Sequence, residues 1–170
     1  FIGVVSIALI TLLFNLDRRQ TWLPLAAFVG GAAVGLIDDY LNIFGSNKKD
    51  AGMRAPVKFA LITLIGLVLG WFFFAKLGVS SFHVPFYGDL SVGWLIIPLF
   101  AFAVVATGNA VNISDGLDGL AGGLLAISFV MFGVIALLQG NFLLAGFCFT
   151  VVGALLSYLW FNIYPARFFM

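Results

Sequence analysis

Long apolar runs separated by short polar breaks make up most of the chain. The runs extend over about 1–15, 22–44, 56–76, 93–111, 121–138 and 142–161. A helix needs about 20 mostly apolar residues to cross a bilayer core about 30 Å thick, and most of these runs are on that scale. Because only helices and closed barrels satisfy the backbone inside lipid, the pattern predicts six transmembrane helices, the first of them cut short.

The polar breaks give no sign of separate soluble domains or of an internal repeat. The two longest read "GSNKKDAGMRAP" and "LGVSSFHVPFYGDLSV". We therefore predict an all-α fold, a polytopic transmembrane helix bundle that forms a single membrane domain over residues 1–170. The chain opens inside an apolar run without an initiator Met, so we expect it to be an internal fragment of a larger protein.

The composition agrees with a membrane location and narrows the chemistry. Hydrophobic residues make up 63% of the chain and charged residues 9%, far from the shares typical of soluble domains. Glutamate is absent, so every acid is an aspartate. The single cysteine, Cys148, has no second thiol for a disulfide or a metal cluster, and we expect a small buried side chain. The net charge of +1 says little about partners, and we expect no nucleic-acid partner.

Charged residues gather at one predicted face of the membrane. Because consecutive helices alternate in direction, the second and fourth breaks and the C-terminal stretch share this face. It carries the cations Lys48, Lys49, Arg54, Lys58 and Arg167, whereas Arg18, Arg19 and Lys76 lie near the opposite face. By the positive-inside rule, we expect the first face to lie in the cytoplasm.

Most of the aspartates fall on the same face: Asp38, Asp39, Asp50, Asp115 and Asp118. A charged side chain at membrane depth costs roughly 2.5 to 3.5 kcal/mol on insertion scales, so the adjacent Asp38 and Asp39 require compensation. Both lie toward the negative C-terminal end of a helix, where anions are disfavoured. Mg²⁺ is a natural partner, since one or two carboxylates and substrate phosphates usually hold it. The alternative is a pair of solvated helix-end residues.

A second acidic segment reads "GNAVNISDGLDGLAGG". Its Asp115 and Asp118 share a helix face if the segment is helical. The alternative is a capping box, with Asp115 as the N-cap and Asp118 at the third helical position. Asn109 and Asn112 offer amides that a nucleobase or a sugar could use, although asparagines are also common in turns.

The basic loop before the third predicted helix supplies candidate phosphate ligands. Lys48 and Lys49 are explained by a solvated loop on the cytoplasmic side. Lys58 begins the next helix and faces the acidic end of the previous one, so it is the better candidate for a phosphate or carboxylate contact. We interpret His83, in the break on the opposite face, as a surface residue.

The segments "GLIDDYLN" and "NAVNISDGLDGLAGG", in this order, closely resemble the polyprenyl-phosphate N-acetylhexosamine-1-phosphate transferase family. The run "DDYLN" before a lysine-containing loop favours the muramoyl-pentapeptide branch over the N-acetylglucosamine branch. The resemblance implies transfer of phospho-N-acetylmuramoyl-pentapeptide from a UDP-linked donor to undecaprenyl phosphate, with release of UMP. It also implies a Mg²⁺ cofactor and a multi-pass protein of the bacterial cytoplasmic membrane. Whether the protein is a homodimer is left open.

The resemblance also assigns roles to residues in the segments 38–58, 108–123 and 162–170. It implies catalytic roles for Asp38, Asp39, Asp115, Asp118 and Lys58, with Asp38 and Asp39 as metal ligands. Donor-binding positions would be Asn112, Asp115, Gly116, Leu117, Asp118, Asn162 and Phe169, the last as a ring that stacks on uracil. The family's third acidic metal ligand lies in a motif that this chain does not contain.

Two other functions remain open from the residues. A sister enzyme would transfer N-acetylglucosamine-1-phosphate, or a related sugar phosphate, to a polyprenyl phosphate. An ion or proton transporter would also place acids in a membrane, but it predicts polar residues through the full depth of the helices. The stretches "ALITLIGLVLGWFFF" and "ISFVMFGVIALL" are almost wholly apolar, which favours the transferase.

Overall fold

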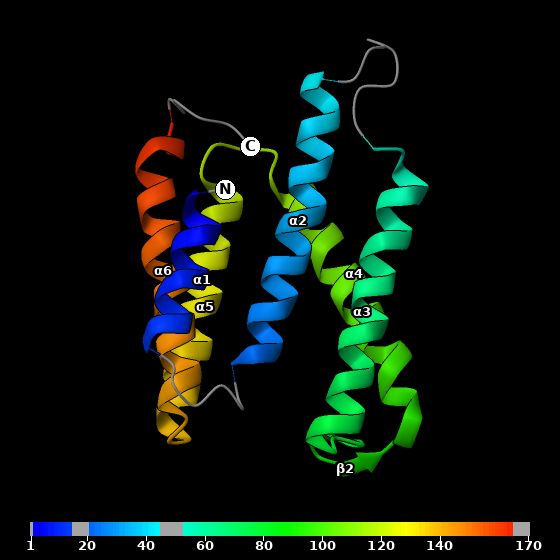
Figure 1. Cartoon of the computed structure of the whole chain (residues 1–170). Coiled ribbons are helices and arrows are strands. Elements are labelled where there is room, and N and C mark those ends of the chain that lie inside the picture. The colour runs from blue at the N-terminus through cyan, green and yellow to red at the C-terminus, as the bar shows by residue number, and fades with distance from the viewer. Residues whose placement is uncertain (1, 15–20, 45–52, 165–170) are drawn as a thin grey trace. The chain divides into compact units, whose positions relative to one another are not determined.

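The computed structural model describes residues 2–14, 21–44 and 53–164, which contain six α-helices. They are α1 (Ile2–Phe14), α2 (Trp22–Phe44), α3 (Ala55–Leu77), α4 (Ile96–Ser114), α5 (Leu120–Leu138) and α6 (Phe142–Asn162), shown in Figure 1. The helices α2 to α6 are long and apolar enough to cross a membrane, and α1 is shorter. The predicted helical membrane fold is therefore confirmed. A 3₁₀ turn at Gly93–Leu95 makes α4 begin later than predicted.

The first compact unit comprises residues 1–25 and 109–170. In this unit α1 and α5 pack against α6, and Figure 1 shows the three helices side by side. Glycines of α5 bring its backbone close to α6, because a Cβ on Gly122 would lie 2.9 Å from Leu159 Cδ2. Near Gly133, Cys148 is 4% exposed, which confirms that its thiol is buried. Small residues allow this close packing in lipid, where apolar burial does not drive helices together.

The second compact unit comprises residues 26–108 and contains most of α2, all of α3 and the first part of α4. Here α3 and α4 meet at Gly66 and Gly70, which are spaced as in a GxxxG motif. A Cβ on Gly66 would lie 2.9 Å from the Ala101 Cα, and one on Gly70 would lie 2.9 Å from the Ile97 carbonyl oxygen. Because these neighbours are backbone atoms, neither glycine can be enlarged without moving a helix.

A β-hairpin joins α3 to α4, and the sequence analysis did not predict it. Its strands are β1 (Ser81–Val84) and β2 (Gly88–Ser91), paired in antiparallel register. His83 lies opposite Asp89, and its Nδ1 is 2.8 Å from the Asp89 Oδ1. Both side chains are exposed, which confirms the prediction that His83 is a surface residue. The strands were missed because each has only four residues and neither has one consistently buried face.

Hydroxyl side chains inside the helices bond to their own helix. The hydroxyl groups of Thr63, Ser128, Thr150 and Ser157 each donate to the carbonyl four residues earlier, at distances of 2.8 to 3.0 Å. This local bonding is a common way to satisfy a hydroxyl group where no water is available. These polar residues therefore need no polar partner on another helix, and they do not form a polar path.

Candidate functional site

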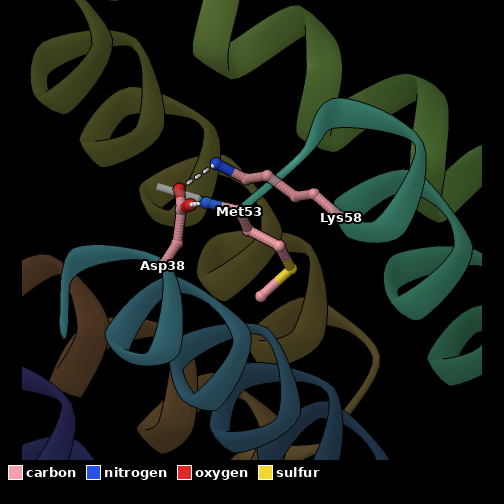
Figure 2. A network of polar contacts seen from close by, with 3 residues as sticks. All are labelled: Asp38, Met53 and Lys58. Carbon is pink, nitrogen blue, oxygen red and sulfur yellow. Dashed lines mark hydrogen bonds and ion pairs between the residues drawn. The ribbon is translucent and has the colours of Figure 1, made fainter. Parts of the chain in front are cut away.

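The carboxylate of Asp38, near the C-terminal end of α2, is bonded at both oxygens. The Lys58 Nζ donates to Oδ2 at 2.7 Å, and the Met53 backbone N–H donates to Oδ1 at 2.8 Å. Figure 2 shows the two donors converging on the carboxylate. The side chain of Asp38 is 16% exposed and that of Lys58 is 41% exposed. Two donors thus offset the cost of placing the Asp38 charge at this helix end. One is Lys58, which was a candidate from the sequence, and the other is the Met53 amide, which was not.

The start of α3 positions Lys58 for this contact. Pro56 occupies the first turn of the helix, where its missing N–H costs no hydrogen bond. The N–H groups of Val57 and Lys58 both donate to the Arg54 carbonyl, at 2.9 and 3.1 Å. Lys58 therefore lies in the first turn of α3, where its N–H and that of Val57 bind the Arg54 carbonyl. Arg54 is exposed at the N-cap position, and no hydrogen bond or ion pair of its side chain is found among the described residues.

Asp39 has a different environment from Asp38. Adjacent residues of a helix point about 100° apart, so the two carboxylates diverge. Asp39 is exposed, and among the described residues its carboxylate has neither a hydrogen bond nor an ion pair. Of the pair, Asp38 binds Lys58, whereas the exposed Asp39 carboxylate has no partner among the described residues.

The segment with Asp115 and Asp118 is a turn, not a helix. Helix α4 ends at Ser114, residues 115–119 form turns, and α5 begins at Leu120. The N-cap of α5 is Gly119, with φ of 77°, and no side chain caps the helix there. The capping-box alternative is therefore wrong, because the left-handed glycine delays the start of α5 beyond both aspartates. Asp115 and Asp118 are partly exposed in this turn, and Gly116 and Leu117 are exposed.

The last residue of α6 binds this turn. Asn162 is 2% exposed, and its Oδ1 accepts a hydrogen bond of 2.9 Å from the Gly119 N–H. The partners are 43 residues apart in the chain. A lone asparagine at a helix end gives no signal in the sequence for such a long-range contact. Asn112, in the last turn of α4, is exposed, as is Asn109.

Several predicted residues lie outside the described ranges. They are Lys48, Lys49, Asp50, Arg167 and Phe169, together with the cations Arg18 and Arg19. The stacking role assigned to Phe169 therefore stays a prediction.

The donor set at Asp38 and Asp39 fits a hard cation such as Mg²⁺. Within residues 2–14, 21–44 and 53–164, no group of three or more His, Cys, Asp and Glu side chains could hold a metal by itself. Mg²⁺ usually needs only one or two carboxylates, and phosphates and waters complete its shell. Asp39 can offer such an oxygen at once. Asp38 can do so with the lone pairs that Lys58 and Met53 leave unused.

Comparisons with known proteins agree on one family. The sequence profile described as "Glycosyl transferase family 4" matches residues 21–170. A Chloroflexus aggregans protein named phospho-N-acetylmuramoyl-pentapeptide-transferase is 39% identical over 175 residues, covering 98% of this chain and 48% of that protein. Proteins of the same name from Desulfosudis oleivorans and Clostridium perfringens are 36% identical over 98% and 100% of this chain, and 51% and 52% of theirs. The chain spans about half the length of these relatives.

Proposed function

The chain belongs to glycosyl transferase family 4, and from this premise we propose that the full-length protein transfers phospho-N-acetylmuramoyl-pentapeptide. The donor is its UDP-linked form, the acceptor is undecaprenyl phosphate, and UMP is released. The observation that carries the proposal is the Asp38–Lys58 pair beside the exposed Asp39 near the end of a membrane helix. Support comes also from the shared name of relatives that this chain matches over almost its whole length.

The reaction exchanges one phosphoanhydride bond for another. An oxygen of the lipid phosphate attacks the donor phosphorus that carries the sugar. The bond from that phosphorus to the bridging oxygen breaks, and UMP leaves with the oxygen and the electron pair. Because a phosphate monoester is already largely dianionic at neutral pH, the acceptor needs little help from a base. The protein must chiefly position the reactants and offset their negative charge.

We assign the phosphates to the group formed by Asp38, Asp39 and Lys58. Lys58 neutralises Asp38, so the pair adds little net charge where anionic phosphates must bind. The Asp39 carboxylate is exposed, and Asp38 and Asp39 would be the carboxylates that hold Mg²⁺. When bound, Mg²⁺ would offset the charge of the donor pyrophosphate. A lysine that can exchange a carboxylate for a phosphate also supplies a mobile positive charge.

We assign the uridine part of the donor to the turn before α5. Asp115 and Asp118 are partly exposed acceptors, and Gly116 and Leu117 present exposed backbone between them. A ribose hydroxyl or a uracil N–H needs acceptors of this kind. Asn112, exposed in the last turn of α4, adds an amide. Catalytic roles for Asp115 and Asp118 belong to the same proposal.

We also propose a location and an orientation. The protein would be a multi-pass protein of the bacterial cytoplasmic membrane, with Asp38, Lys58 and the turn of Asp115 on the cytoplasmic side. The positive-inside bias of the sequence supports this orientation. A water-soluble UDP-linked donor made in the cytoplasm would require it.

The direct test uses the purified full-length protein in detergent. UMP release and formation of lipid-linked product are measured with UDP-N-acetylmuramoyl-pentapeptide, with and without undecaprenyl phosphate. We expect equal amounts of UMP and lipid product, both dependent on the acceptor and on Mg²⁺. Equal or faster turnover with UDP-N-acetylglucosamine would assign the protein to the sister branch. No UMP release with either donor would overturn the transferase proposal.

A further inference from the structure

The β-hairpin lies at the membrane face opposite to Lys58. Lys58 is in the first turn of α3, and the hairpin follows the last turn of this membrane helix, as Figure 1 shows. Only residues 78–80 separate α3 from β1, and three residues reach about 10 Å at most. The N–H groups of Val92 and Gly93 donate to the Ser80 carbonyl at 2.9 and 3.0 Å, which closes the base of the hairpin. The hairpin is therefore held at the membrane surface, about 30 Å from Lys58.

The two faces of the hairpin differ in polarity. Because successive residues of a strand point to opposite faces, Phe82 and Leu90, which are paired in the register, share one face. His83 and Asp89 are paired on the other face. Phe82 and Leu90 are 37% and 39% exposed, whereas the side chains of His83 and Asp89 are 69% and 76% exposed. The hairpin is thus amphipathic, with a polar face open to water and an apolar face that the described chain does not bury.

The tip of the hairpin holds an aromatic residue in a strained conformation. The Tyr87 N–H donates to the Val84 carbonyl at 3.1 Å, and Pro85 and Phe86 form the turn between them. Phe86 has a φ of 70°, as at the third position of a type II turn, where glycine is preferred. Among the described residues, Phe86 alone combines a side chain with a φ in this region. Phe86 is nevertheless fully exposed, so no contact with the described chain explains the phenylalanine.

A phospholipid leaflet accounts for both the apolar face and the tip. The headgroup region of a bilayer favours aromatic side chains with a polar end, such as those of Tyr and Trp. Tyr87 is 80% exposed beside Phe86, and Trp94 is 67% exposed between the hairpin and α4. Apolar side chains also remain exposed at the adjoining ends of the membrane helices, at Leu77 and Leu95. The apolar surface of the hairpin therefore continues into helices whose surroundings are lipid.

We propose that the hairpin is an interfacial membrane anchor, whose apolar face and aromatic tip insert into the phospholipid leaflet opposite to Lys58. The polar pair of His83 and Asp89 stays in water on the other face. This inference goes beyond the proposed transferase function and does not rest on it. It assigns a role to the one part of the described chain that is neither a helix nor part of the proposed site.

The test locates the hairpin in the full-length protein, held in phospholipid nanodiscs. Fluorophenylalanine replaces Phe86 or Phe82 as a probe of nearly the same shape for fluorine NMR. The matched control carries the same probe in place of His83, on the polar face of the same strand. Dissolved oxygen, which concentrates in lipid, and a gadolinium chelate, which stays in water, are added separately. The relaxation that each agent causes then reports whether a probe lies in lipid or in water.

We expect oxygen to relax the probes at positions 86 and 82 at least about twofold more than the probe at position 83, and the chelate to show the reverse order. Phe86→Gly removes the ring and suits a φ of 70°, so the hairpin should stay folded. In this variant the probe at position 82 should become about twofold more accessible to the chelate, because the tip no longer holds the hairpin in the leaflet. Asp89→Asn, on the polar face, should leave that access unchanged.

Three results would overturn the inference. Equal responses to the chelate at positions 86 and 83 would show that the tip lies in water. A probe at position 86 that is shielded from both agents would show that protein covers the tip, from a second copy or from another part of the full-length chain. Unchanged chelate access at position 82 in Phe86→Gly would show that the tip does not hold the hairpin in place. None of these readouts requires transfer activity, so a failure of the proposed function would leave the test intact.

Discussion

The two polar groups of this chain are held in different ways. The Asp38 carboxylate is bound by a lysine side chain that is 41% exposed and by one backbone amide. The turn of Asp115 and Asp118 is bound at its end by an asparagine that is 2% exposed. The first contact joins charges at the edge of solvent. The second is a neutral hydrogen bond inside the protein.

This difference matches the two ligands in the proposed reaction. In the proposed reaction phosphates bind and leave, so a charged group that can exchange partners suits them. A partly exposed ion pair contributes only about 0 to 1 kcal/mol and can give way to a stronger ligand. A nucleoside must instead meet fixed acceptors, and a buried hydrogen bond keeps them in place. The predictions below test whether the two groups respond as differently as their contacts do.

The largest loss is expected for the acidic pair on α2. We predict that Asp38→Asn and Asp39→Asn each lower the rate of UMP release by about 10²- to 10³-fold, because charge stabilisation of the phosphates is lost. Mg²⁺-dependent UMP release by the full-length protein measures the effect. Asp89→Asn, in the exposed hairpin pair, is the matched control and should retain the wild-type rate. Near-normal UMP release by both α2 variants would show that these carboxylates are not part of the active site.

A somewhat smaller loss is expected for Lys58. Lys58→Ala leaves the Asp38 carboxylate without its ion-pair partner. It also removes the positive charge from the residues that we propose bind the phosphates. We predict about 10²-fold slower turnover, with part of the rate restored by Lys58→Arg. Lys76 lies exposed in the last turn of the same helix, so Lys76→Ala is the control. Equal effects of the two alanine variants would mean that Lys58 acts only through the general charge of the protein.

A moderate effect is expected at Gly119. Gly119→Ala forces a side chain into the left-handed region, at a cost of about 1 to 2 kcal/mol. We predict weaker UMP binding by about five- to tenfold and faster hydrogen exchange over residues 112–120. Gly123→Ala should change neither quantity. If Gly119→Ala binds UMP as wild type does, the shape of this turn does not determine donor affinity.

The smallest effect is expected from salt, which should weaken the Asp38–Lys58 contact but not the Asn162–Gly119 hydrogen bond. Raising NaCl from about 0.05 to 0.5 M screens the partly exposed Asp38–Lys58 pair but not the buried bond of Asn162. We therefore predict faster hydrogen exchange of the Met53 amide, by no more than about fivefold, with exchange at Gly119 unchanged. A parallel response at both amides would contradict the distinction between the two groups.

Much of the fold was accessible from the sequence because lipid imposes a simple rule. Runs of about 20 apolar residues must be helices, and the helices α2, α3, α5 and α6 lie where the apolar runs predicted them. The hairpin β1–β2 was missed because short exposed strands have no burial pattern to reveal them. The turn at 115–119 was ambiguous, since the same aspartates also fit a capping box.

The site was predictable in its residue types but not in its pairings. The cost of carboxylates in a membrane helix singles out Asp38 and Asp39 from the sequence alone, and Lys58 is a candidate partner for either. Which carboxylate the lysine binds depends on the direction of side chains at two helix ends. The Met53 amide and the Asn162–Gly119 bond depend on backbone geometry and on a contact across 43 residues, for which local sequence carries no signal.

The most direct test of the division between the two groups measures binding and turnover in the same preparations. UMP affinity and the rate of UMP release are compared for Asp39→Asn and Asp118→Asn in the full-length protein. We predict that Asp39→Asn lowers kcat by at least about 10²-fold with UMP affinity within about threefold of wild type, and that Asp118→Asn weakens UMP binding by about tenfold. Weakened UMP binding in Asp39→Asn together with wild-type UMP affinity in Asp118→Asn would contradict it.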